Sequence, residues 1–355
     1  MKNITNTHIS SFCEYSVFFI LSVLVLFTTV YFGGVTPAGQ LVTAVSVFLL
    51  SLVCACKISF GDTFVFVPST SFFIFAALTA LIYLSTRYSI YSFVSYREFL
   101  LFAMLLVIYF SVFSSVSLPG IKSFTRILSI LVSLLSLLGI ATLFLKRYDL
   151  FSYTKIYYRN RLTSTFINPN NFGGLLNLCM PLMFYNGMVS RGGRRLFFLA
   201  LFGVSIAALV LTYSYGSMIS GIGGFACFLF GVSALHTKSQ ATSRKNLFAV
   251  SVFIAAAAAG IIVMASRFSF QNKIYSLLTH FTLLSDSIVH YFRTLLDAPF
   301  RFIFGYGAGT YQFLAQNITS SLTLKTAEHV HNEYIQFFIE TGLIGGLLFL
   351  VFWTM

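Results

Sequence analysis

Charged residues are scarce in this chain of 355 residues. They make up 9% of it, and only nine of them are acidic. A soluble globular domain carries about 25% charged residues. Because 57% of the residues are hydrophobic, a soluble fold of this length could not hide its apolar side chains. The composition therefore excludes a soluble globular protein and favours an integral membrane protein.

Metal-binding and redox motifs are also lacking. The five cysteines have no zinc-ligand spacing, and Cys54-x-Cys56 is too short for a redox pair. A zinc site at His329-x-His331 would lack a third and a fourth ligand at a plausible spacing. We therefore expect neither a metal nor a cofactor.

Positive charge exceeds negative charge, with a formal net charge of +13 at pH 7. In a soluble protein this excess would indicate a nucleic-acid partner. Here the Lys and Arg residues lie in short loops between apolar runs, where they set the topology and contact anionic lipid headgroups. We therefore expect membrane lipids, and no nucleic acid, as partners. Since few acidic residues oppose this charge, a charged substrate is expected to be an anion.

Ten apolar runs approach or reach the length of about 20 residues that a helix needs to span a bilayer. They are Tyr15–Gly33, Ala38–Cys56, Phe64–Leu84, Glu98–Val116, Ser123–Leu145, Asn171–Val189, Leu196–Tyr213, Ser217–Leu235, Leu247–Ala265 and Tyr334–Trp353. The third run contains Pro68, which makes it the least regular. Backbone groups in lipid must be hydrogen-bonded within their own segment, which favours helices. The sequence thus predicts an all-α, polytopic membrane helix bundle with about ten transmembrane helices, organised as a single domain over residues 1–355.

The distribution of Lys and Arg among the loops predicts the orientation. The most densely positive short loops belong in the cytoplasm, together with the amino terminus. Two long polar segments, Lys146–Asn170 and Ser266–Glu333, then lie on the outer side. The first is itself basic, which means either that the topology is wrong there or that the segment binds an anion. The second is expected to form a small helical cap, because its stretch Ile274–Leu296 is amphipathic.

The last apolar run begins with the most informative stretch of the chain. Glu333, Gln336 and Glu340 are spaced i, i+3 and i+7, which places them on one helix face. A carboxylate in a membrane helix is costly and usually faces the bundle interior or a wet cavity. His331 is expected at the mouth of the bundle above this polar stripe, either as a catalytic group or as an interfacial side chain without chemistry.

This stretch resembles the signature of the O-antigen ligase and polymerase superfamily, which reads His, then Asn, Ser or Gln, then nine residues, then Gly-x-x-Gly. His331-Asn332 and Gly342-Leu-Ile-Gly345 match it in full. Two further stretches are similar to family elements, namely Arg161 followed by Asn168-Pro169-Asn170, and Arg293 followed by Gly305-x-Gly307-x-Gly309. The resemblance covers roughly residues 161–353, whereas the amino-terminal helices agree only in character.

The resemblance implies an enzyme that transfers a glycan from an undecaprenyl-diphosphate carrier to a lipid A core or to another glycan. The reaction would occur on the periplasmic face of the bacterial inner membrane and without a metal. His331 would be catalytic and would activate the acceptor hydroxyl or assist the leaving diphosphate, which suits a side chain that titrates near neutral pH. Arg293 would hold the diphosphate through charge-assisted hydrogen bonds. Asn332 and Arg161 are the further implied substrate-binding residues.

One element departs from the family pattern. Family members often carry Ser-Arg-Gly at the outer end of a middle helix, where the Arg contacts the diphosphate. Here Ser214-Tyr215-Gly216 stands in that place, so Tyr215 supplies a hydroxyl but no charge. Arg161 or Arg159 is expected to supply the missing charge. The chain also stops at Met355, directly after the last run, so we expect a truncated copy that lacks the helices closing the bundle.

Three interpretations remain open at this point. The enzyme is a ligase or a polymerase, which differ in their acceptor. A transporter or flippase for a lipid-linked sugar would have polar residues deep in several helices and inverted repeats, whereas Glu340 is the one such residue found. A catalytically inactive, truncated relative is the third interpretation, which the substitution at Tyr215 keeps open.

Overall fold

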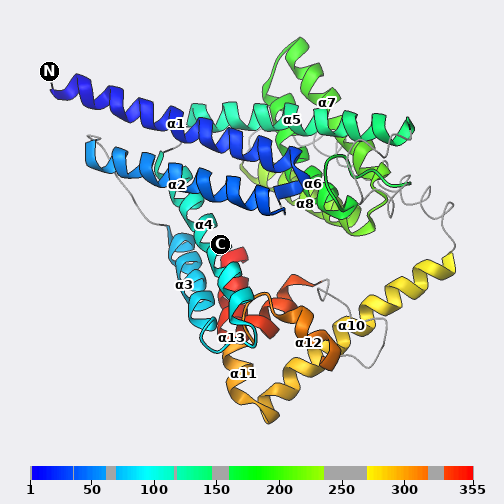
Figure 1. Cartoon of the computed structure of the whole chain (residues 1–355). Helices are drawn as coiled ribbons and strands as arrows, with labels where there is room; N and C mark the ends of the chain where they lie inside the picture. Colours follow the sequence, from blue (N-terminus) through cyan, green and yellow to red (C-terminus); the bar gives the residue numbers. More distant parts are fainter. Residues whose placement is uncertain are drawn as a thin grey trace. The chain divides into compact units, whose positions relative to one another are not determined.

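The computed structural model describes residues 2–34, 36–60, 69–115, 118–145, 160–235, 270–318 and 332–354. Every regular element within these ranges is a helix (Figure 1). Eight of these helices are long and apolar enough to cross a membrane, and a ninth, shorter helix is also apolar. The predicted fold class, an all-α multi-pass membrane bundle, is therefore confirmed.

The helices of the described residues include most of the predicted runs, although α1 begins at Lys2, well before its run at Tyr15. They are α1 (Lys2–Val30), α2 (Pro37–Phe60), α3 (Thr70–Ser85), α4 (Ser92–Ser115), α5 (Leu118–Phe144), α6 (Pro169–Val189), α7 (Gly193–Leu211), α8 (Tyr215–Leu235), α10 (Phe270–Asp297), α11 (Pro299–Phe304), α12 (Tyr311–Ile318) and α13 (Glu333–Thr354). The predicted run Leu247–Ala265 lies outside the described residues. The run expected at Phe64–Leu84 becomes the shorter α3, whose first turn is capped by the Ser69 hydroxyl, which accepts a hydrogen bond from the Phe72 N–H.

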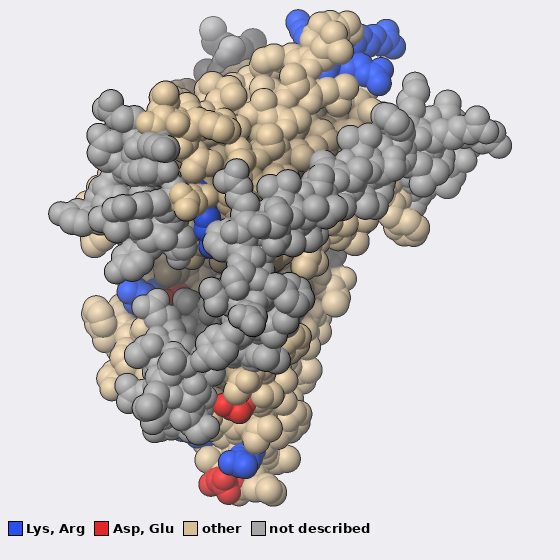
Figure 2. All heavy atoms as spheres, turned by 90° about the vertical axis from the view of Figure 1, so that its right-hand side faces the viewer, with Lys and Arg blue, Asp and Glu red and all other residues tan. Residues whose placement is uncertain are grey.

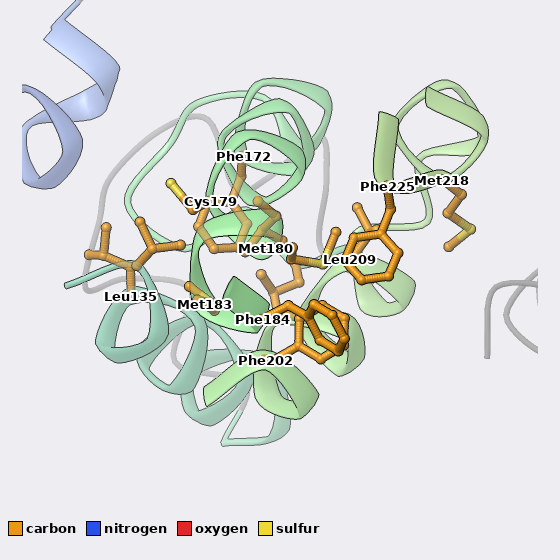
Figure 3. Packing of buried hydrophobic residues seen from close by; sticks show 14 of the residues in the cluster. Leu135, Phe172, Cys179, Met180, Met183, Phe184, Phe202, Leu209, Met218 and Phe225 are labelled. Carbon is orange, nitrogen blue, oxygen red and sulfur yellow. The ribbon is translucent and has the colours of Figure 1, made fainter. Parts of the chain in front are cut away.

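The helices form two compact units, which we describe separately. One unit comprises Ser11–Leu49 and Val116–Phe268, and its core lies among α5, α6, α7 and α8. The rings of Phe184, Phe202 and Phe225 pack against one another there, with centroid separations of 5.3 to 5.5 Å (Figure 3). These contacts hold α6, α7 and α8 together.

The other unit comprises Met1–Ser10, Leu50–Ser115 and Ser269–Met355. Within it, α3 packs against α4 and α13, α11 packs on α13, and α10 contacts both α11 and α13. A core of Tyr291, Tyr311, Leu314, Ala315 and Ile339 joins α10, α12 and α13. The cap helices and the last membrane helix are therefore one packed body.

The surface agrees with a lipid environment. Large apolar side chains such as Phe12, Phe93 and Leu178 are 71%, 82% and 75% exposed. On the face drawn in Figure 2, charged side chains are few among the described residues. Exposed apolar area on this scale would drive a soluble protein to aggregate, whereas acyl chains cover it in a bilayer.

Candidate functional site

A glycine-rich loop follows α11 and lies directly on α13. Gly305, Gly307 and Gly309 all have positive φ angles, which a loop that reverses direction so tightly requires. The backbone N–H groups of Tyr306 and Gly307 donate to the carbonyl oxygens of Ile339 and Glu340, at 3.2 and 2.8 Å. The loop is therefore bonded to the main chain of α13 and is not a free surface turn.

α13 is kinked at Gly342, the first glycine of the predicted signature. Its φ is 70° and its ψ is −170°, so the helical backbone is interrupted there. A Cβ atom at Gly342 would collide with the carbonyl oxygen of Ile303, and one at Gly305 would collide with the carbonyl oxygen of Glu340. The glycines at these two positions let two backbones meet without an intervening side chain.

The carboxylate of Glu340 completes this contact. Its two oxygens accept hydrogen bonds from the N–H of Gly309 at 2.7 Å, from the N–H of Tyr311 at 3.1 Å and from the Gln336 side-chain amide at 3.1 Å. Glu340 and Gln336 are buried, whereas Glu333 is exposed at the start of the helix. The predicted polar stripe therefore points into the unit at its two inner positions, and Glu340 fastens the glycine loop. Sequence reasoning noted the stripe but did not place Glu340 among the site residues.

Asn332 begins α13. Its Oδ1 atom accepts a hydrogen bond from the Ile335 N–H at 3.1 Å, and its carbonyl oxygen accepts one from the Gln336 N–H at 3.0 Å. The structure thus gives this predicted substrate-binding residue a helix-capping role. His331, which directly precedes it, lies outside the described residues, and so do His329 and Arg159. Their functional roles stay predictions.

Arg293 lies on α10 in the same unit as Asn332, and its side chain is exposed. Nearby Tyr291 anchors the helix: its ring stacks on Phe302 of α11 at 4.8 Å, and its hydroxyl donates to the Phe302 carbonyl at 3.2 Å. The ring also meets Phe338 of α13 edge-on at 5.7 Å. Burial raises the pKa of Tyr291 to about 12. Arg293 therefore lies at the surface of its unit, on a helix that is fixed to α11 and α13.

A second arginine, which sequence reasoning missed, is built into the same region. Arg301 donates from one guanidinium nitrogen to the Tyr88 carbonyl at 2.7 Å and to the Gly305 carbonyl at 3.3 Å. Its guanidinium carbon lies 5.3 Å from the centre of the Tyr306 ring. Burial raises the pKa of Tyr88, against the opposing effect of the Arg301 charge. Arg301 thus joins the α3–α4 turn to the glycine loop.

His290 lies beside this cluster. Its ring centroid is 5.9 Å from that of Tyr306. Burial, and then the positive charge of Arg293, lower the pKa of His290. Its Nε2 atom is buried and meets no hydrogen-bond partner among the described residues. Burial and the charge of Arg293 therefore favour the neutral form of the His290 imidazole.

Arg161 is held in the other unit by groups at the ends of two helices, α6 and α7. Its Nε donates to the Thr212 carbonyl at 2.8 Å, and a terminal nitrogen donates to the Asn170 side chain at 3.1 Å. The next residues of the chain, Leu162 to Thr165, are buried, and the Ser164 hydroxyl donates to the Leu135 carbonyl at 2.6 Å. This buried segment fixes the backbone from which Arg161 extends.

Tyr215 is the first residue of α8, and it packs in part against the core of the same unit. The Thr212 carbonyl that receives Arg161 lies three residues before it. The structure therefore brings Arg161 to the segment that leads into Tyr215. The predicted site residues thus fall into two pairs, Arg293 with Asn332 in one unit and Arg161 with Tyr215 in the other.

Arg293 and Arg161 supply positive charge, which suits an anionic group. Within the part of the chain that the structure describes, no group of three His, Cys, Asp or Glu side chains is placed to hold a metal ion.

Comparison with known proteins agrees with these features. No curated protein and no solved structure matches the chain. A family model described as O-antigen ligase does match, over residues 199–350. The matched region runs from α7 through the glycine loop to the kinked α13, so it contains Arg293, Tyr215 and the His331–Gly345 signature. Over residues 199–350, the resemblance to the O-antigen ligase and polymerase superfamily is confirmed.

Proposed function

We propose that this protein transfers a glycan from an undecaprenyl-diphosphate carrier to an acceptor at the periplasmic face of the bacterial inner membrane. The observation that carries the proposal is the fit of the Gly342 kink to the loop at Gly305, fastened by the Glu340 carboxylate. This contact lies inside the region that matches the family. It holds rigid the helix whose first turn follows His331.

The reaction we propose is a displacement at the anomeric carbon. The acceptor hydroxyl oxygen forms the new bond to that carbon, and the bond from carbon to the diphosphate oxygen breaks. His331 accepts the hydroxyl proton, a role that imidazole performs well near neutral pH. The undecaprenyl diphosphate leaves with the bonding electrons. Arg293 and Arg161 stabilise the phosphate charge that grows as this group departs.

The periplasmic location rests on the charge of the loops and agrees with the packing inside each unit. The Ile90 N–H donates to the Tyr306 carbonyl at 3.1 Å, so the α3–α4 turn and the glycine loop share one side of their unit. In the other unit the Thr165 hydroxyl donates to the Thr29 carbonyl at 2.6 Å, which places Thr165 beside the end of α1. The proposed topology requires both pairings. Cysteine labelling from the periplasm should modify Thr319→Cys and miss Gly193→Cys in a background without native cysteines, and the reverse pattern would contradict it.

Replacement of His331 is the direct test of the enzymatic role. The purified protein would be placed in nanodiscs with a lipid-linked glycan donor, and lipid A core or a second lipid-linked glycan would be offered as acceptor. The wild-type protein should form product with one of them, which also separates a ligase from a polymerase, and His331→Ala should form none. His280→Ala, a histidine in the cap, is the matched control and should retain activity. Product formation by His331→Ala would overturn the proposal. If the protein reconstituted in vesicles moved the donor from one leaflet to the other without forming product, it would be a flippase.

A further inference from the structure

The cap helix α10 has an apolar face that the protein leaves uncovered. Its packed face consists of Leu283, Ser287, Tyr291 and Thr294, all of which are buried. A separate sector of the same helix carries large apolar side chains that are exposed. They are Phe281 at 60%, Val289 at 48%, Phe292 at 60%, Leu295 at 49% and Leu296 at 84%. A helix with one packed face and a second, exposed apolar face needs another partner for the exposed one.

The contacts of the neighbouring α11 and glycine loop show where this face lies along the membrane helices. The Ser95 hydroxyl donates to the Ala308 carbonyl at 2.8 Å, and Arg301 donates to the Tyr88 carbonyl at 2.7 Å. Ser95 stands one turn inside the candidate span Ser92–Ser114, and Tyr88 precedes that span. The loop and α11 therefore lie at the membrane-surface end of α4.

Tyr291 ties the carboxyl-terminal end of α10 to the same level. Its hydroxyl donates to the Phe302 carbonyl of α11 at 3.2 Å. Phe292 and Leu296 lie within about two helical turns of Tyr291, so they are within roughly 10 Å of this level along the helix. At the same end of the unit, Phe93 is 82% exposed, and Tyr91, Phe300 and Ile303 are exposed as well. Exposed aromatic and aliphatic side chains gathered at the end of spanning helices are typical of the bilayer interface.

The charged residues of α10 lie beside the apolar sector and not within it. Arg293 follows Phe292 and precedes Leu296 by three residues, so its guanidinium borders the apolar face. Such a helix lies in the plane of a bilayer, with its apolar side chains at the boundary between headgroups and acyl chains. We propose that the exposed face of α10, continued by Phe300 and Ile303 of α11, inserts into the lipid leaflet on this side of the membrane.

Insertion of α10 into the leaflet also positions Arg293 relative to the donor, a step that rests on the proposed function. With Leu296 among the acyl chains, the Arg293 guanidinium lies at the depth of the lipid phosphates. The diphosphate of a polyprenyl carrier sits at that depth, because its isoprenoid chain is in the same leaflet. The interfacial helix would therefore deliver the arginine to the donor without lifting the donor out of the membrane.

Tryptophan quenching tests the lipid contact without any donor. The chain contains one Trp, Trp353, which would be replaced by Phe. Leu296→Trp would then be compared with the matched control Asp297→Trp, a neighbouring exposed residue on the charged side of the helix. In nanodiscs of phosphatidylcholine brominated along its acyl chains, Leu296→Trp should lose most of its emission and shift it to shorter wavelength, and Asp297→Trp should be affected much less.

Two results would overturn the proposal. Red-shifted, unquenched emission from Leu296→Trp would show that the face lies in water. Blue-shifted, unquenched emission would show that protein covers it, and a doubled mass in the same nanodiscs would identify a second copy as the occupant. The consequence for the donor is tested separately with Leu296→Glu, which should raise KM for the lipid-linked donor several-fold with little change in kcat. An unchanged KM would remove the role of α10 in donor delivery. If the wild-type protein showed no transfer that depends on His331, that result would count against the proposed function alone.

Discussion

The carboxylate of Glu340 lies 2.7 Å from the backbone nitrogen of Gly309, although 31 positions separate the two residues in the chain. Its second oxygen accepts from the N–H of Tyr311. One side chain of the last helix therefore satisfies two backbone donors of the preceding loop. This geometry makes Glu340 a positioning residue, because it fixes the loop and the cap against the helix that follows His331.

We expect substitutions of Glu340 to loosen this contact in a graded way. Glu340→Ala leaves two buried N–H groups without an acceptor, and each costs about 1–3 kcal/mol. Glu340→Gln keeps the volume and one carbonyl acceptor, so it should be intermediate in thermal stability and in turnover. The matched control is Glu333→Gln, which changes an exposed carboxylate of the same helix. Equal effects of Glu340→Gln and Glu333→Gln would argue against the positioning role.

The close approach of two backbones at Gly305 and Gly342 predicts a strong effect of a single methyl group. Gly342→Ala should lower the free energy of unfolding by more than the about 1–3 kcal/mol that a backbone conformation restricted to glycine costs by itself, because the added Cβ meets the Ile303 carbonyl. Gly192→Ala isolates the conformational cost, since Gly192 also has a positive φ but nothing lies near its Cβ position. Thermal unfolding in nanodiscs should rank Gly342→Ala well below Gly192→Ala, and a similar loss for both would show that the contact is not tight.

The two arginines of the cap region should respond differently to substitution. Arg293→Lys should lower turnover about tenfold with little change in stability, because Lys cannot reproduce the bidentate geometry of a guanidinium. Arg301→Met should instead lower the melting temperature, since it leaves the Tyr88 and Gly305 carbonyls without their donor. Turnover and thermal unfolding would be measured on both variants. A destabilised Arg293→Lys with normal turnover per folded molecule would remove Arg293 from the proposed site.

Arg161 and Tyr215 can be tested as a compensating pair. Arg161→Gln should reduce turnover at least about tenfold, in line with the loss of one charge-assisted interaction worth about 1.5–3 kcal/mol. Adding Tyr215→Arg should restore a large part of it, because Arg161 bonds to the Thr212 carbonyl in the segment that leads to Tyr215. Tyr215→Phe in the Arg161→Gln background is the control and should restore nothing. Failure of Tyr215→Arg to rescue a folded protein would contradict the idea that Arg161 supplies the missing charge.

The lowered pKa of His290 predicts a loss of stability in acid. Below its ordinary value of 6.5 the unfolded state takes up a proton that the folded state resists, because burial and Arg293 disfavour the charged imidazole. The contribution is therefore fully present above pH 6.5 and is lost as the pH falls through the lower pKa of the folded state. His290→Gln should show a smaller drop in melting temperature between pH 7.5 and pH 5 than the wild type. Parallel curves for the two proteins would show that His290 does not titrate in this way.

Much of the architecture follows from the sequence alone. The apolar runs predict α6, α7 and α8 to within a few residues, because length and hydrophobicity are local properties of the chain. The capping role of Asn332 carries a local signal too, since Asn is a favoured residue at the N-cap position just before a helix. Hydrophobicity was a weaker guide at α3. The run was predicted to start at Phe64, whereas the helix begins at Thr70, after the Ser69 cap.

Only the tertiary structure decided what the polar residues contact. The sequence placed Glu340 on a polar helix face and Gly342 in a signature, but their partners Gly309 and Ile303 belong to a distant loop. Arg301 had no periodic signal at all, because its bonds go to backbone carbonyls, which every residue possesses. Burial of a polar group is decided by which segments pack around it, so the pairing that satisfies its hydrogen bonds emerges only when the chain is folded.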